Sequence, residues 1–278
     1  MVDSNNITTF MRWPGSKWRI ADWIIAHFPD DHGVYCEPFF GSGAVFFRKM
    51  PSGTETINDI DGNVVNLFRV IRDAADDLCK KIEMTPYARA EYRASFDLSC
   101  DDDIERARRF LVRIWQGYGG KTYCSTAWSN SRVNSVFRPK YWSMVPDKIM
   151  AVVSRLKMAQ IENMDARELI PFYNNQDVLL YVDPPYLRGT RTNLHYSCEF
   201  SKEQEHQKLL ELCRNHKGPC VISCYDNPLY AEELAGWTKK SIQARTTHAH
   251  VATESIYMNP VCDKEMNLFL ECAEGAMA

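Results

Sequence analysis

The amino-acid sequence predicts an α/β protein with a mostly parallel sheet. Two short apolar runs near the N-terminus are each followed by a helix-forming segment, which is the pattern of a βαβα unit. A continuous apolar run at 178–182 is typical of a strand buried on both faces, and a helix and another strand follow it. The chain has 278 residues, of which 45% are hydrophobic and 25% charged, so it can form one or two ordinary globular domains.

The N-terminal unit begins with an expected strand at 34–37. A glycine-containing turn over 38–43 and a helix-forming stretch at 44–50 follow it. A second strand is expected at 55–58, and apolar residues over 64–71 then recur at helical spacing. This order predicts strand, turn and helix twice in succession.

The C-terminal part repeats the alternation. The apolar run at 178–182 ends at two prolines, a helix is expected at 203–214, and a further strand at 220–223. Two more extended segments, 253–259 and 267–271, are expected to add an antiparallel edge to the sheet. Residues 72–158, between the two parts, form a mostly polar and helical pattern with few strand signals, and this segment is predicted to be an insertion.

The insertion differs from the rest of the chain in charge. The net charge of the whole protein is −3, but residues 104–157 contain eleven Lys or Arg against two acidic residues. That segment is +9 and the remainder −12, which indicates a surface that faces an anion such as nucleic acid. A solvated helical surface is the alternative interpretation.

Several classes of protein are disfavoured. No apolar run approaches the length of a membrane span, and the first ten residues lack the apolar core of a signal peptide, so a cytoplasmic protein is expected. The ten cysteines include no C-x-x-C pair, and His206, Cys213, His216, Cys220 and Cys224 do not match a common zinc spacing. We therefore expect neither a disulfide framework nor a metal site.

The turn at 37–43 reads Glu-Pro-Phe-Phe-Gly-Ser-Gly and lies between a strand and a helix. Its glycines allow a ligand to approach the backbone closely, but position 46 is Phe and Glu37 would repel a pyrophosphate, so the dinucleotide fingerprint is incomplete. Asp59 ends the next strand, where a carboxylate can accept hydrogen bonds from ribose. A nucleoside with a cationic tail, such as S-adenosylmethionine, suits these two acids; a purely structural turn is the alternative.

The sequence Asp183-Pro184-Pro185-Tyr186 follows the buried strand at 178–182. Two prolines fix two backbone φ angles, and they leave the Asp183 carboxylate and the Pro184 carbonyl as rigid neighbouring acceptors. Tyr186 adds a flat face. This arrangement can accept both hydrogens of an exocyclic amino group and stack on its ring, although a strand terminator with a packed tyrosine remains the simpler interpretation.

Four motifs in this order resemble those of the Dam-like adenine-specific DNA methyltransferases of the alpha group. They are residues 13–17 (Trp-Pro-Gly-Ser-Lys), 37–43, 58–61 (Asn-Asp-Ile-Asp) and 183–186. The resemblance covers about residues 12–71 and 178–260. It implies a Rossmann-like S-adenosylmethionine-dependent methyltransferase sheet, with 1–71 and 159–278 as the catalytic domain and 72–158 as an inserted, mainly helical target-recognition domain.

The resemblance also assigns roles to residues. The target adenine would be held by the catalytic residues Asp183, Pro184, Pro185 and Tyr186. The S-adenosyl-L-methionine site would be lined by Trp13, Lys17, Glu37, Phe39, Gly41, Gly43, Asp59 and Asp183. The implied activity is transfer of a methyl group to the 6-amino group of an adenine flipped out of double-stranded DNA, with no metal.

Two other functions compete with this hypothesis. One is an amino-methyltransferase that acts on cytosine, RNA or a protein amide. The other is a catalytically silent DNA-binding relative. In relatives of the first kind, Ser or Asn usually stands at the position of Asp183, so the acid favours adenine in DNA. Residues 116–123 only loosely resemble the insertion of GATC-methylating members, so a GATC target is not implied.

Overall fold

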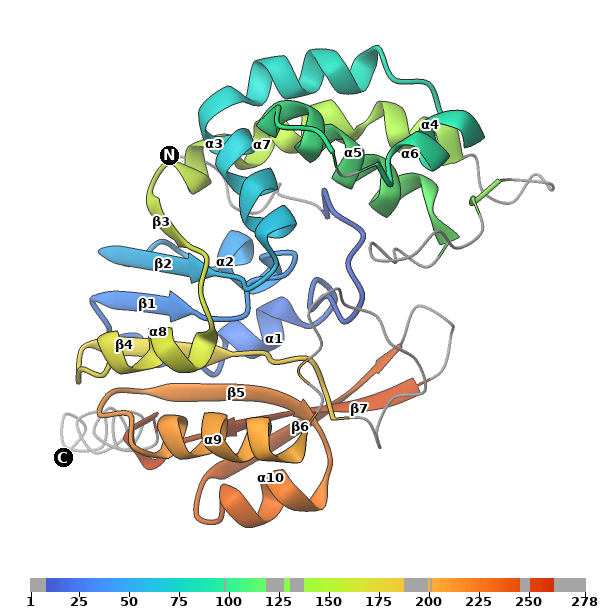
Figure 1. The fold of residues 1–278 in the computed structure, drawn as a ribbon. Helices are drawn as coiled ribbons and strands as arrows, with labels where there is room; N and C mark the ends of the chain where they lie inside the picture. Colours follow the sequence, from blue (N-terminus) through green and yellow to red (C-terminus); the bar gives the residue numbers. More distant parts are fainter. Residues whose placement is uncertain are drawn as a thin grey trace, which may run out of the picture.

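A computed structural model of the chain describes residues 9–97, 99–118, 128–130, 138–187, 200, 202–245 and 251–262. A seven-stranded sheet forms the centre of the molecule, and helices cover both of its faces (Figure 1). The predicted α/β class is confirmed.

The sheet has the strand order β3-β2-β1-β4-β5-β7-β6. Strands β1 to β5 are parallel to their neighbours, and β7 pairs antiparallel with both β5 and β6. The strands are β1 (Val34–Glu37), β2 (Thr54–Asn58), β3 (Ala159–Glu162), β4 (Val178–Val182), β5 (Cys220–Tyr225), β6 (Thr238–Arg245) and β7 (Val251–Met258). The chain runs outward from β1 to β3 and then returns to β4 on the other side of β1, so the order reverses between β1 and β4.

The outer strand of the antiparallel edge differs from the sequence prediction. The expected strand at 253–259 is found as β7, but its outer partner is β6, which the sequence analysis did not predict. The segment 267–271, expected as that partner, lies outside the described residues. Strand β6 reads Thr-Lys-Lys-Ser-Ile-Gln-Ala-Arg, and such a polar, lysine-rich sequence is common at sheet edges and lacks the apolar signal of a buried strand.

Helices cover the sheet in two groups. Helices α8, α9 and α10 lie on one face, where they pack on Val178, Leu180 and Val182 of β4. The alternate residues of β4, Leu179 and Tyr181, face a larger cluster on the other side. The helices are α1 (Ala21–Ile25), α2 (Ala44–Arg48), α3 (Gly62–Glu83), α4 (Arg89–Ala94), α5 (Asp103–Gln116), α6 (Arg138–Ser143), α7 (Val145–Leu156), α8 (Ala166–Phe172), α9 (Glu203–Arg214) and α10 (Pro228–Glu233). Among the described residues, no helix is both long enough and apolar enough to cross a bilayer.

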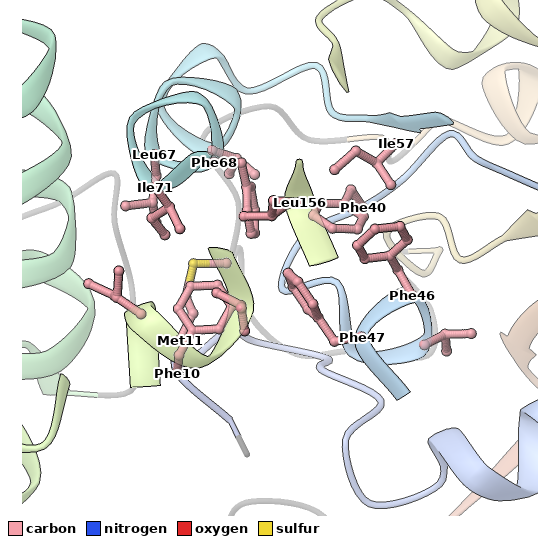
Figure 2. Packing of buried hydrophobic residues seen from close by; sticks show 14 of the residues in the cluster. Phe10, Met11, Phe40, Phe46, Phe47, Ile57, Leu67, Phe68, Ile71 and Leu156 are labelled. Atoms are coloured by element: carbon pink, nitrogen blue, oxygen red, sulfur yellow. The ribbon is translucent and has the colours of Figure 1, made fainter. Parts of the chain in front are cut away.

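The larger hydrophobic cluster runs without interruption from the sheet into the helices of the inserted segment. Figure 2 shows Phe46 and Phe47 of α2, Phe68 of α3 and Leu156 of α7 pointing into one shared core. The same cluster includes Phe110 of α5. Helices from residues 72–158 are therefore packed on the sheet domain through a common apolar core.

A buried ion cluster joins the same two regions. The Glu55 carboxylate in β2 is 1% exposed and receives hydrogen bonds from Lys49, at 2.6 Å, and from both terminal nitrogens of Arg155 in α7. The Arg155 guanidinium also lies over the Phe46 ring, 3.9 Å from its centroid. Burial alone would raise the pKa of Glu55, but these cations hold its pKa below the ordinary value.

The basic character of residues 104–157 is reduced by pairing within the protein. Arg113 and Arg155 are buried, and three further arginines of α5 form ion pairs with nearby carboxylates. These pairs are Arg106 with Asp103, Arg108 with Glu91 and Glu105, and Arg109 with Asp97 and Glu105. Three of these four acids precede residue 104, so the charge count of the segment did not include them.

Candidate active site

Three carboxylates lie at the carboxyl ends of neighbouring parallel strands. Glu37 is the last residue of β1, and Asp59 and Asp183 directly follow β2 and β4. Strand order reverses between β1 and β4, and in open α/β sheets this position forms the ligand crevice. The fold thus brings together acids that are more than 140 positions apart in the chain.

The turn between β1 and α2 has the backbone conformation that its glycines predict. Gly41 and Gly43 have φ angles of +49° and +65°, in the left-handed region that disfavours other residues. The Gly41 N–H donates to Asp59 at 2.9 Å, which links the turn to β2. A Cβ atom on Gly41 would lie 2.8 Å from the indole nitrogen of Trp13, so Trp13 closes over the turn.

The N-terminal loop brings a lysine into this crevice. Lys17 is 5% exposed, and its ammonium group lies 2.8 Å from the Asp183 carboxylate and 3.0 Å from the Gly15 carbonyl. The hydroxyls of Ser16 and Ser42 are 2.6 Å apart and join the loop to the glycine turn. The loop predicted from residues 13–17 is therefore part of the same site.

Asp183 carries a perturbed carboxylate. Burial raises its pKa to about 6, while the positive charge of Lys17 acts in the opposite direction. The negative charge of Glu254, on β7, raises this pKa further. A carboxyl group that titrates near neutral pH in a crevice is typical of a functional site.

Tyr186 is fixed by residues from distant strands. Its hydroxyl donates to Glu254 at 2.8 Å, and its ring meets the edge of the Tyr225 ring with centroids 4.4 Å apart. The Lys17 ammonium lies 4.7 Å from the Tyr186 ring centroid. Sequence analysis did not identify Glu254 or Tyr225 as partners of this tyrosine. A signal in the sequence was Glu254 itself, the one charged residue of strand β7.

Glu37 and Asp59 differ in their surroundings. Glu37 is 2% exposed and accepts a hydrogen bond from the Tyr35 hydroxyl at 2.7 Å. Burial raises the pKa of Glu37 well above its ordinary value. Burial also raises the pKa of Asp59 to about 6, although its two oxygens accept backbone N–H groups from Gly41 and Asp61. Each Asp59 oxygen has a second lone pair for a further donor.

The remaining predicted site residues lie around this centre. Pro184 and Pro185 follow Asp183 directly, and Gly43 is the N-cap of α2. Phe39 packs on Phe200, with ring centroids 5.6 Å apart, in the cluster that faces α8 and α9.

Residues 188–199, part of the resemblance, lie outside the described residues. Within the described ranges, no group of three or more His, Cys, Asp or Glu side chains has the arrangement of a metal site.

A family model for "D12 class N6 adenine-specific DNA methyltransferase" matches residues 13–248. The chain belongs to this family. The resemblance inferred from the four motifs is confirmed, and the protein is an adenine-specific DNA methyltransferase that uses S-adenosyl-L-methionine as methyl donor.

Individual relatives agree with the family. The chain is 24% identical over 247 residues to the type II methyltransferase M1.LlaDCHI of Lactococcus lactis subsp. cremoris, covering 82% of this chain and 84% of the relative. It is 28% identical over 188 residues to a DNA adenine methylase of Haemophilus influenzae, covering 64% and 63%. A solved SAM-dependent methyltransferase from Agrobacterium tumefaciens has 10% identity and a TM-score of 0.42, with 88% of this chain and 62% of that chain covered. The assignment depends on the sequence matches alone.

The residues of the crevice fit the methyl donor of this family. S-adenosyl-L-methionine carries an ammonium group, a sulfonium group, a carboxylate and a ribose. The crevice offers the buried carboxylate Glu37, the partly buried carboxylate Asp183, the cation Lys17 and the hydrogen-bond acceptor Asp59. The left-handed turn at Gly41 leaves no room for a Cβ atom beside Trp13, as expected where a ligand and the backbone are close.

Proposed function

We propose that Asp183, Pro184, Pro185 and Tyr186 hold the target adenine, flipped out of double-stranded DNA, beside the methyl donor. The observation that supports this proposal most directly is the contact between Lys17, Asp183 and Tyr186 at the reversal point of the sheet. There an ammonium group forms an ion pair with the Asp183 carboxylate at 2.8 Å and lies over the face of Tyr186. The amino group of adenine, an N–H donor attached to an aromatic ring, would require the same two partners: a carboxylate that accepts its hydrogen and an aromatic ring that stacks on the base.

Asp183 and Pro184 would prepare the amino group for reaction. The lone pair of the adenine amino nitrogen is delocalised into the ring, which makes this nitrogen a poor nucleophile. Two fixed acceptors, the Asp183 carboxylate and the Pro184 carbonyl, can bind both N–H hydrogens and favour a pyramidal nitrogen. Catalysis would then depend on positioning and on fixed charges rather than on a covalent enzyme intermediate.

When bound, the donor would supply an electrophilic methyl group. The amino nitrogen would take this group from the sulfur, which would keep the electrons of the broken carbon–sulfur bond, and the proton released from the nitrogen would pass to solvent. Tyr186 would stack on the flipped base and offset part of the few kcal/mol that unpairing and unstacking cost. Its hydrogen bond to Glu254 and its contact with Tyr225 keep the ring in place before DNA binds. The side chain is therefore ordered in advance, which reduces the entropy lost on binding.

For the donor site, we assign a charge or a hydrogen-bond role to each polar residue. Glu37 would receive the ammonium group, Lys17 the carboxylate and Asp59 the ribose hydroxyls. Trp13, Phe39, Gly41 and Gly43 would line the same pocket as apolar walls or as closely approaching backbone. These assignments match the signs of the ammonium and carboxylate charges of the donor.

The segment 72–158 would form the target-recognition domain, between the two parts of the catalytic domain, 1–71 and 159–278. Despite the charge pairing within α5, Lys140 and Lys157 are among the exposed cations of the described part of this segment and would be available for contact with phosphates. Since the substrate is DNA, we place the enzyme in the cytoplasm, where bacterial and phage DNA is found.

The test is methyl transfer from labelled S-adenosyl-L-methionine to unmethylated plasmid, followed by nucleoside analysis. We expect 6-methyladenine with the wild type and none with Asp183→Ala. A matched control is Asp22→Ala, because the Asp22 side chain is 71% exposed and pairs with Arg48 rather than with a residue assigned to the site. Circular dichroism of each variant would show whether it is folded. Undiminished transfer by Asp183→Ala would refute the assigned role.

A further inference from the structure

A tyrosine beneath the donor site contacts one of its carboxylates. Tyr35 and Glu37 are two residues apart on β1, so their side chains share one face of the sheet. The Tyr35 hydroxyl donates to the Glu37 carboxylate at 2.7 Å. Tyr35 is fully buried and Glu37 is 2% exposed, so no solvent competes for this hydrogen bond.

The other charged groups near Glu37 have partners of their own. They are Lys49 from α2, Glu55 from β2, and Tyr181 and Asp183 from β4 and its end. Lys49 donates to Glu55 at 2.6 Å and lies over the Tyr35 ring, 4.4 Å from its centroid. Asp183 is paired with Lys17. Within the described part of the chain, Glu37 forms no ion pair, and its side chain accepts one hydrogen bond, from Tyr35.

We propose that Tyr35 is a positioning residue of the donor site. Its hydroxyl holds Glu37 toward the ammonium group of S-adenosyl-L-methionine, and Glu37 loses its proton when that group binds. This inference rests on the proposed role of Glu37 in binding the donor. The proton passes from the Glu37 carboxyl to the buffer, and the ammonium charge replaces it. No oxidation, reduction or covalent bond to the protein is involved.

The electrostatics of the crevice support the exchange. Burial raises the pKa of Glu37, the nearby Asp183 raises it further, and the hydrogen bond from Tyr35 lowers it. Without a cation of the ligand, burial thus shifts Glu37 toward its protonated form, although the positive charge of Lys49 acts in the opposite direction. An ammonium group within contact distance favours the carboxylate instead, so we expect binding of the donor to be coupled to proton release.

Tyr181 provides a matched control. It is also fully buried and lies on β4 two residues before Asp183, so the two strands carry the same Tyr-x-acid pattern. Its hydroxyl pairs with Ser223 at 2.9 Å rather than with either acid. Tyr181→Phe thus removes a hydroxyl from the same layer without removing a hydrogen bond to Glu37.

The experiment is isothermal titration calorimetry of the full-length protein, without DNA, between pH 5.5 and 8.5. S-adenosylhomocysteine is the probe, because it keeps the ammonium group and lacks the sulfonium charge. Titrations in buffers of different ionisation enthalpy give the number of protons released. For the wild type we expect proton release on binding.

Tyr35→Phe should bind the probe roughly tenfold more weakly, because one hydrogen bond to a charged group is lost. The pKa of Glu37 should rise when the hydrogen bond from Tyr35 is lost. The affinity for the probe should therefore begin to fall at a higher pH than in the wild type. Tyr181→Phe should behave as the wild type, and Glu37→Gln should abolish proton release. The Glu37→Gln result stands even if Tyr35→Phe does not fold.

Unchanged affinity and proton release in Tyr35→Phe, with normal binding by the wild type, would overturn this inference alone. An equal loss in Tyr181→Phe would also overturn it, because the effect would then come from packing. Failure of the wild type to bind the probe would instead refute the assignment of the donor site itself.

Discussion

Removing Arg155 should destabilise the protein strongly although the residue is far from the reacting groups. Arg155→Met keeps most of the apolar stem but removes the guanidinium that donates two hydrogen bonds to Glu55 and packs on Phe46. Breaking a buried ion pair costs about 3–5 kcal/mol. Because Lys49 still compensates the Glu55 charge, we expect the low end, about 3 kcal/mol.

The assay is urea unfolding at pH 7, followed by circular dichroism. Arg106→Met is the matched control, since Arg106 is 38% exposed and pairs with Asp103 on the surface of α5; its expected cost is within about 0.5 kcal/mol. The pKa of Glu55 lies below its ordinary value, so the stabilisation is present at neutral pH and is lost as the pH falls through the folded-state pKa. Equal shifts of the unfolding midpoint in the two variants would show that the buried cluster contributes nothing special.

Three further predictions concern the active site. Methyl transfer should fall roughly tenfold between pH 7 and pH 5, because Asp183, with a pKa of about 6, gains a proton in that interval; a flat pH profile of kcat/KM would contradict its role. Glu254→Gln keeps an acceptor for the Tyr186 hydroxyl and should retain activity, with the acid limb of the pH profile moved to lower pH. Glu254→Ala removes that acceptor and should raise the KM for DNA several-fold. Steady-state kinetics on plasmid would show whether the two variants differ. Gly41→Ala should weaken donor binding in calorimetry about tenfold more than Gly236→Ala. Gly236 also has a positive φ, +88° against +49° for Gly41, but a Cβ atom there would have no neighbour within 4 Å. Similar affinities of the two variants would exclude a steric role of the turn.

Much of the fold could be predicted because the central strands carry strong local signals. The strands expected at 34–37 and 178–182 and the helix expected at 203–214 are found with those bounds. These strands are buried on both faces, so their sequences are continuously apolar and end at polar residues. The turn at Gly41 was also predictable, since its conformation is determined by residues within a few positions of each other.

The parts that were not predicted depend on contacts between distant segments. Glu254 lies 68 positions after Tyr186, and only the antiparallel pairing of β7 with β5 brings the two side chains together. Strand β6 is an edge strand with a polar sequence, so it resembles a loop until its partner is known. The net charge of residues 104–157 suggested a free basic surface, whereas Arg106 pairs within α5 and Arg108 and Arg109 pair with acids outside it.

The shared core also limits how new sequence specificity can arise in this protein. A recognition domain with its own core could be exchanged between homologues as a unit, but in the segment proposed for recognition Leu156 packs into the sheet core and Arg155 neutralises a carboxylate of β2. If segment 72–158 came from a homologue, its residues at these two contacts would not match the sheet domain that receives it. Variation in recognition should therefore accumulate in surface residues between the helices, and chimeric enzymes should fold only when both halves of the Arg155–Glu55 pair are transferred together.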